Sequence, residues 1–216
     1  GMLIAAKEYI DEHGADGRKA NLFGQEFNGT VWSIAKMNML LHGISHADIR
    51  NADTLADPKH LDPATGELMR FDRVLANPPF SQNYIKKDIK FPGRFPVWLP
   101  EKGKKADLMF VQHMLAVLKA DGKLATVMPH GVLFRGNAEA EIRKSLVRRG
   151  LVHALIGLPA NLFYGTGIPA CMVVLEKENA AARTGVFMID ASKGFRKDGP
   201  KNRLREQFKN HKLPTA

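Results

Sequence analysis

The chain has 216 residues and a mass of 24.0 kDa, and 44% of its residues are hydrophobic, so we expect one substantial core rather than two independent domains. Its apolar stretches end well short of the roughly 18 to 20 residues that a membrane span needs, and no charged-then-apolar leader opens it. We therefore expect a soluble, cytoplasmic protein without a membrane partner. Cys171 is the only cysteine, which excludes an internal disulfide and a cysteine-based zinc site.

The chain is strongly basic, with a formal net charge of +10 and a pI near 9.8, which indicates an anionic partner and favours nucleic acid. Lys and Arg concentrate in residues 86–105, where they number seven against two acidic residues, and in residues 193–216, where they number eight against two. Such runs are more often solvated faces than binding sites, so they do not establish DNA binding by themselves. We expect a folded domain over residues 1–192 and a basic C-terminal extension over residues 193–216.

Strands and helices alternate along most of the chain. Asn28 is placed to cap the second helix, and Asp121-Gly122 to close the third. Apolar residues at helical spacing predict helices over residues 2–13, 29–41, 108–118 and 137–149. Short apolar runs predict strands over residues 20–23, 46–49, 71–76, 123–128, 151–158, 170–176 and 186–189.

The order of these elements predicts an α/β fold with an open, doubly wound sheet. The last two strands, over residues 170–176 and 186–189, have no helix-length segment between them. We therefore expect them to form an antiparallel hairpin at the C-terminal edge of the sheet.

Asn77-Pro78-Pro79-Phe80 directly follows the strand over residues 71–76, at the end where open α/β sheets place ligand sites. Two prolines fix the backbone, so the side-chain carbonyl of Asn77 and the main-chain carbonyl of Pro78 can both face a pocket. Phe80 adds a flat apolar face. Two acceptors and a ring suit a planar base with an exocyclic amine; the alternative is a proline turn without chemistry, which the aromatic fourth residue disfavours.

This four-residue signature resembles that of adenine-N6 and related amino-methyltransferases, and the resemblance extends over nearly the whole chain to the methylation (modification) subunits of type I restriction-modification systems. It implies a Rossmann-like methyltransferase sheet, S-adenosylmethionine as cofactor, and methylation at N6 of an adenine flipped out of DNA, without a metal. Asn77, Pro78 and Phe80 would then be catalytic, and Pro79 would bind the substrate. The domain over residues 1–192 would be a partial methyltransferase domain.

The resemblance also assigns three acidic residues to the cofactor. Glu26 would accept hydrogen bonds from the ribose hydroxyls, Asp53 would contact the adenine amine of the cofactor, and Asp107 would lie close to it. Each has a structural alternative. Glu26 would be a charge at a helix N-terminus, Asp53 a turn cap for a local backbone N–H, and Asp107 a helix N-cap.

The loop after the strand over residues 151–158 resembles the one that completes the target-base pocket in this family. Phe163, or else Tyr164, would sandwich the extruded adenine opposite Phe80. Stacking on an aromatic ring is worth roughly 1 to 3 kcal/mol, which offsets much of the cost of extrusion. The alternative is that these aromatic side chains belong to the core.

The start of the chain departs from the family pattern, because only Gly1 could represent the glycine-rich loop that approaches the cofactor. We therefore expect an N-terminally truncated chain that by itself binds S-adenosylmethionine weakly or not at all and can self-associate through its open sheet edge. The resemblance implies double-stranded DNA, the specificity subunit and the restriction subunit of a type I complex as partners.

Two other functions stay open from the sequence. Glutamine-N5 methyltransferases of release factors share a related signature, usually with tyrosine in the aromatic place, although the basic charge and the motifs after residue 158 favour DNA. The third possibility is a non-catalytic, truncated DNA-binding or assembly module.

Overall fold

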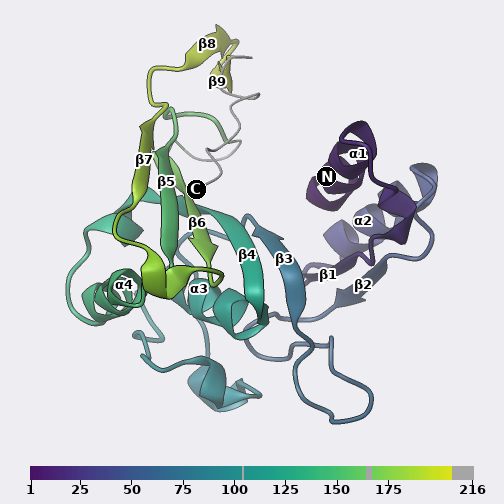
Figure 1. Ribbon diagram of the computed structural model, residues 1–216, viewed down its shortest axis with the longest axis horizontal. Helices are drawn as coiled ribbons and strands as arrows, with labels where there is room; N and C mark the ends of the chain where they lie inside the picture. Colours follow the sequence, from purple (N-terminus) through teal and green to yellow (C-terminus); the bar gives the residue numbers. More distant parts are fainter. Residues whose placement is uncertain (104, 164–166, 206–216) are drawn as a thin grey trace. The chain divides into compact units, whose positions relative to one another are not determined.

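The computed structural model describes residues 1–103, 105–163 and 167–205, which fold into two compact units (Figure 1). The first unit comprises residues 1–70 and 84–94, and the second comprises residues 71–83 and the chain from residue 95 on. Within the described residues, no helix is long and apolar enough to cross a membrane. The basic extension expected from residue 193 stays a prediction.

The first unit contains α1 (Met2–Glu12), β1 (Phe23–Glu26), α2 (Gly29–Leu41) and β2 (Asp48–Asn51), with short 3₁₀ helices over Gly17–Lys19, Lys86–Asp88 and Pro92–Arg94. Strands β1 and β2 are parallel, and α2 connects them. Asn28 caps α2 as predicted, because its side chain accepts a hydrogen bond from the Val31 N–H. Gly43, with φ of +69°, then ends the helix in the left-handed region.

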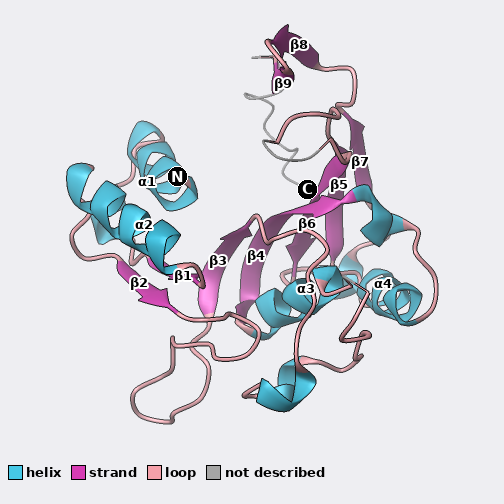
Figure 2. Cartoon of the chain, turned by 180° about the vertical axis from the view of Figure 1, so that it is seen from behind, coloured by secondary structure: helices cyan, strands magenta, loops and turns pink. Residues whose placement is uncertain are grey.

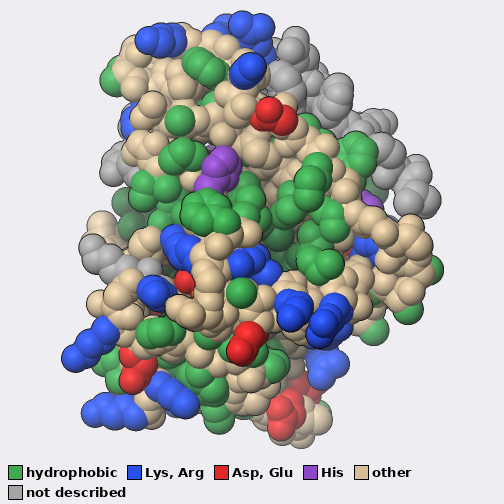
Figure 3. Space-filling view, turned by 90° about the vertical axis from the view of Figure 1, so that its left-hand side faces the viewer, with side chains coloured by type: hydrophobic (Ala, Val, Ile, Leu, Met, Phe, Trp, Pro, Cys, Tyr) green, Lys and Arg blue, Asp and Glu red, His purple; other side chains and the backbone are tan. Residues whose placement is uncertain are grey.

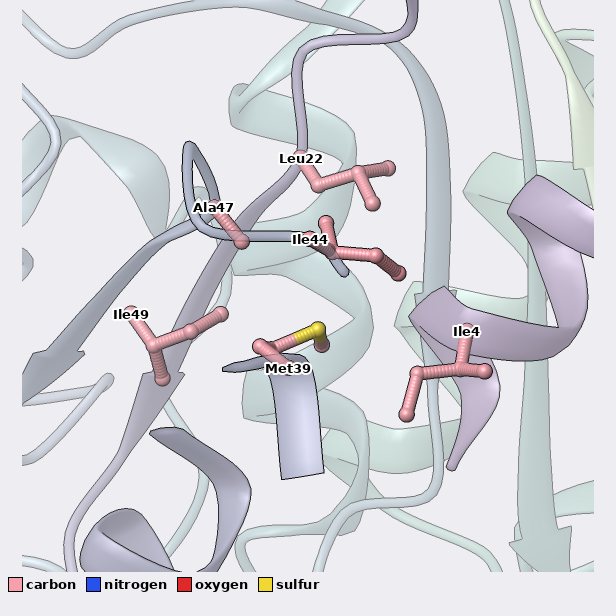
Figure 4. Packing of buried hydrophobic residues seen from close by; sticks show 6 residues of the cluster. All are labelled: Ile4, Leu22, Met39, Ile44, Ala47 and Ile49. Carbon is pink, nitrogen blue, oxygen red and sulfur yellow. The ribbon is translucent and has the colours of Figure 1, made fainter. Parts of the chain in front are cut away.

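The core of the first unit explains why its strands begin later than predicted. Leu22 and Ala47 lie in the predicted strands but ahead of β1 and β2, and both are buried. These two residues are apolar because they are buried in the core beside the helices. The paired register of β1 and β2 begins one residue after each of them. The buried cluster consists of Ile4, Leu22, Met39, Ile44, Ala47 and Ile49 (Figure 4).

The second unit is built on a five-stranded mixed sheet in the order β3-β4-β6-β5-β7 (Figure 2). The α/β class predicted from the sequence is thereby confirmed. Its strands are β3 (Phe71–Ala76), β4 (Leu118–Pro129), β5 (Val152–Gly157), β6 (Ala170–Glu176) and β7 (Phe187–Asp190). Its helices are α3 (Asp107–Ala116) and α4 (Ala138–Arg148), with 3₁₀ helices over His130–Leu133 and Ala180–Ala182.

The predicted hairpin between residues 170–176 and 186–189 is wrong. Strand β6 lies between β4 and β5 and is antiparallel to both, whereas β7 pairs in parallel with β5. Burial explains the order: β6 is buried along most of its length, as a central strand requires, while β7 is mostly exposed and suits the edge. The connection between them is long enough to pass over one strand.

The third helix is shorter than predicted. It ends at Ala116, and Leu118 already belongs to β4, where it pairs with Phe71 and is fully buried. Asp121 and Gly122 lie inside β4 and therefore do not close the helix as predicted. A Cβ at position 122 would lie 2.7 Å from the Leu118 side chain, which favours glycine there. Leu118 has the spacing of the next apolar residue of the helix, so the sequence predicted it to be helical, but it is buried as part of strand β4.

A small antiparallel hairpin, β8 (Phe195–Asp198) and β9 (Lys201–Leu204), was not predicted. Its two-residue loop begins with Gly199 at φ of +60°, which is what a type II′ turn requires of its first position. The loop pair Gly199-Pro200, with glycine in the first position, is the sequence signal that would have revealed it. The residues around the turn are polar and basic, so they lack the apolar runs from which strands were predicted.

Candidate active site

The turn Asn77-Pro78-Pro79-Phe80 follows β3 directly, as predicted. The Asn77 side chain is exposed, and among the described residues it has no hydrogen-bonding partner. Phe80 is half-buried. The amide oxygen of Asn77 is therefore available to a ligand, and its binding of a base amine stays a prediction.

Phe80 contacts Phe163, which lies in the loop between β5 and β6. The ring centroids are 6.2 Å apart and the planes meet at 80°, an edge-to-face arrangement. The structure thus brings together two aromatic residues that are 83 positions apart, both of which the sequence assigned to the target base. A base sandwiched between these two rings would require them to move apart and turn parallel, so the sandwich stays a prediction. Tyr164, the other candidate, lies outside the described residues.

A buried carboxylate fixes the chain just after the turn. Ser81 has φ of +57°, a strained value for a residue other than glycine. Its N–H donates to Asp107 Oδ1 at 2.8 Å, and the N–H of Ala106 donates to the carbonyl of Gln82 at 3.1 Å. Asp107 is 1% exposed and begins α3 without capping it, so its side chain holds the Ser81 conformation rather than the helix end.

The second oxygen of Asp107 binds Arg135. Arg135 Nη1 lies 2.8 Å from Asp107 Oδ2, and the Arg135 side chain is 30% exposed. Gly131 makes this contact possible, because a Cβ at that position would lie 2.5 Å from the guanidinium. Arg143 of α4 supports the same segment by donating to the carbonyls of Val132 and Arg135. None of these partners of Asp107 was predicted from the sequence.

Glu139 lies beside this pair in an unfavourable environment. Its Oε2 is 3.5 Å from Arg135 Nη1, but it is buried and accepts no hydrogen bond from a described residue. Burial raises the pKa of Glu139 above its usual value, and the attraction of Arg135 only partly opposes this. The folded chain therefore binds the Glu139 proton more tightly than the unfolded chain does.

This raised pKa predicts a pH-dependent stability. The contribution is fully present below the unfolded pKa, about 4, and is lost as the pH rises through the folded pKa. Glu139→Gln cannot ionise, so we expect the wild-type chain to lose free energy of unfolding relative to this variant as the pH rises from about 4 to neutral. Urea unfolding of both chains across this range tests the prediction, and parallel pH profiles would contradict it.

The cofactor candidates of the first unit lie at the ends of its strands. Glu26 ends β1, and its Oε1 accepts a hydrogen bond from the Asn28 N–H at 2.8 Å. Asp53 follows β2, and its Oδ1 accepts from Leu55 and Ala56 at 2.8 and 3.1 Å, which is the predicted turn cap. No described residue hydrogen-bonds the other oxygen of either carboxylate, which leaves it for a ligand.

A buried arginine anchors the turn that carries Asp53. Arg94 is 5% exposed and donates to the main-chain carbonyls of Thr54, Leu55, Lys90 and Phe91. Burial lowers the pKa of Arg94 to about 10, so it stays charged at neutral pH.

Gly1 stands at the N-cap of α1, with open space where a side chain would be. In the described part of the chain, no cluster of three or more His, Cys, Asp or Glu side chains is arranged to hold a metal ion.

Comparisons with known proteins give consistent matches over nearly the whole chain. The family model described as "N-6 DNA Methylase" matches residues 1–213. The HindI type I restriction enzyme methylase subunit of Haemophilus influenzae is 33% identical over 202 residues, which are 92% of this chain and 44% of that protein. The MpnII methylase subunit of Mycoplasma pneumoniae is 38% identical over 194 residues, which are 84% of this chain and 35% of that protein.

A solved structure agrees with these matches. The crystal structure of the type I restriction-modification system methyltransferase subunit from Streptococcus thermophilus covers 96% of this chain at 40% identity, with a TM-score of 0.80. It confirms the methyltransferase type of α/β sheet that the sequence predicted. This chain spans 44% of that subunit, and less than half of the two curated relatives above.

Proposed function

Because the chain belongs to the N-6 DNA methylase family, we propose that it carries the catalytic site of a type I modification methyltransferase, which methylates N6 of adenine in DNA. The observation that carries this proposal is the exposed Asn77 amide, to which no described residue hydrogen-bonds. It follows the end of β3 in the same turn as Phe80, whose ring contacts Phe163. The chain spans less than half of its relatives, so the activity is proposed for the whole protein that contains this site.

The turn would bind the target amine through two oxygen acceptors. We assign these to the side-chain carbonyl of Asn77 and the main-chain carbonyl of Pro78, each accepting one N–H of the adenine amine. Held in this way, the amine directs its lone pair at the methyl carbon, and the acceptors stabilise the positive charge that develops on nitrogen. Pro79 keeps the turn rigid, and the excess proton then leaves to water.

Phe80 and Phe163 would hold the flipped base. We propose that the adenine stacks on Phe80 and that Phe163 moves out of its edge-to-face contact with Phe80 to cover the other face of the base. Tyr164 is the alternative to Phe163 in this role. The edge-to-face pair would thus close the site while no base is bound.

The cofactor of this chemistry would be S-adenosylmethionine, which supplies an activated methyl group when bound. Its ribose hydroxyls and adenine amine need oxygen acceptors, and Glu26 and Asp53 each keep one carboxylate oxygen for this purpose. Gly1 would let the backbone approach the methionine part. For Asp107, whose two oxygens already bind Ser81 and Arg135, we propose that it positions the turn instead of contacting the cofactor directly.

The partners follow from the same proposal. The relatives are methylase subunits of type I restriction enzymes, so we propose double-stranded DNA as substrate and the specificity and restriction subunits as protein partners. Chromosomal DNA as substrate would place the protein in the cytoplasm of a prokaryotic cell.

A chimera tests the reaction. This chain replaces the matching region of the Streptococcus thermophilus subunit, which is then assembled with its own specificity subunit and given labelled S-adenosylmethionine. We expect label on N6 of adenine in duplex DNA containing the recognition site, and none on a release factor. Label on release-factor glutamine, or no label in either substrate while the unaltered subunit is active, would contradict the proposal.

A further inference from the structure

The β8–β9 hairpin is fastened to the loop that carries Phe163. The side chain and the backbone N–H of Asn202 donate to the carbonyls of Ala160 and Asn161, at 2.7 and 3.0 Å. Lys201 Nζ donates to the carbonyl of Phe163 at 2.6 Å. Three carbonyls within four consecutive loop residues are therefore held by two neighbouring residues of β9. A displacement of the hairpin must move the loop with it.

The hairpin also concentrates positive charge. Residues 195–204 contain four Lys or Arg and one acidic residue, and basic side chains lie at the top of Figure 3, where the hairpin lies in Figure 1. Arg196 and Arg203 are exposed and directly opposite each other in the ladder, so their side chains share one face. Like charges in this position destabilise a strand pair. Asp198 compensates only in part, because its carboxylate lies 3.5 Å from Arg203 and is itself exposed.

An anion bound across the two arginines would relieve this repulsion, and a phosphate suits their guanidinium groups. On the basis of the proposed function, we infer that the hairpin binds the DNA backbone through Arg196 and Arg203 and, through Lys201 and Asn202, couples that contact to the position of the Phe163 loop. The hairpin contributes affinity without reading sequence, because phosphates carry no base information. DNA binding and closure of the base site become linked through one element.

The test uses the 216-residue chain and a double-stranded DNA of about 20 base pairs, without cofactor, with binding followed by fluorescence anisotropy at several salt concentrations. Arg196→Gln with Arg203→Gln should weaken binding about tenfold at low salt and reduce the salt slope by about 2, as loss of two phosphate contacts predicts. The matched control, Arg148→Gln with Arg149→Gln, removes the same charge from the exposed end of α4 and should change binding much less.

If both double variants lose the same DNA affinity, the charges of the hairpin have no special role and the inference fails. It also fails if the wild-type chain does not bind the DNA. For the coupling, DNA should slow hydrogen exchange at residues 160–163 in the wild-type chain, and Asn202→Ala, which removes one of the three hydrogen bonds, should weaken this protection while keeping the affinity. Protection in Asn202→Ala equal to that in the wild-type chain would overturn the coupling. These readouts involve no methyl transfer, so a failed methylation assay leaves them standing, and their failure leaves the proposed reaction standing.

Discussion

Asn77→Ala in the chimera should lower kcat for DNA methylation about 100-fold or more, with cofactor affinity nearly unchanged. The substitution removes one of two acceptors for the target amine, and this acceptor matters most when the nitrogen becomes positive. Because the Asn77 side chain is exposed and has no protein partner among the described residues, its loss should not destabilise the fold. Single-turnover methyl transfer and isothermal titration with S-adenosylmethionine measure the two effects separately.

Two companion variants sharpen this test. Asn77→Asp keeps an oxygen acceptor and should retain more activity than Asn77→Ala, which a purely structural role of the turn would not predict. Asn21→Ala removes an exposed amide from the first unit and should behave like the wild type. Turnover by Asn77→Ala at the rate of the Asn21→Ala control would remove the basis of the adenine assignment.

The parts of the site that the sequence predicted are those encoded over short stretches. An apolar run broken by two prolines predicts both the end of β3 and the turn after it, because proline acts on its immediate neighbours. The Asn28 cap and the Gly43 stop are equally local. The pairing of Phe80 with Phe163 is different. It spans most of the second unit and was predicted only because the family resemblance related the two motifs.

What the sequence did not predict depends on sheet order and on contacts between distant segments. The insertion of β6 between β4 and β5 follows from burial on both faces, which spacing along the chain does not reveal. The sequence predicts a cofactor ligand or a helix cap at Asp107. It does not predict the contacts of Asp107 with Ser81 and Arg135, because these residues are far from it along the chain. Arg135 follows a short apolar segment, and no local sequence signal relates it to Asp107.

These unpredicted contacts yield the second large effect. Arg135→Met should lower the free energy of unfolding of the 216-residue chain by about 2 to 4 kcal/mol, because it leaves the buried Asp107 carboxylate without its charged partner. In the chimera, below the unfolding temperature, kcat should fall about tenfold or more, since the Ser81 turn loses its support. Arg148→Met, on the exposed end of α4, serves as control and should be neutral in both measurements.

A double variant decides whether the pair acts through Ser81. Asp107→Asn keeps an oxygen for the Ser81 N–H and removes the buried charge, so Asp107→Asn with Arg135→Met should be more stable than Arg135→Met alone and recover part of its kcat. The two groups then act as one unit, in which Arg135 neutralises the carboxylate and the carboxylate holds Ser81 beside Phe80. If the destabilisations of the single variants simply add in urea unfolding, Asp107 and Arg135 do not support the turn jointly, and the positioning role assigned to them fails.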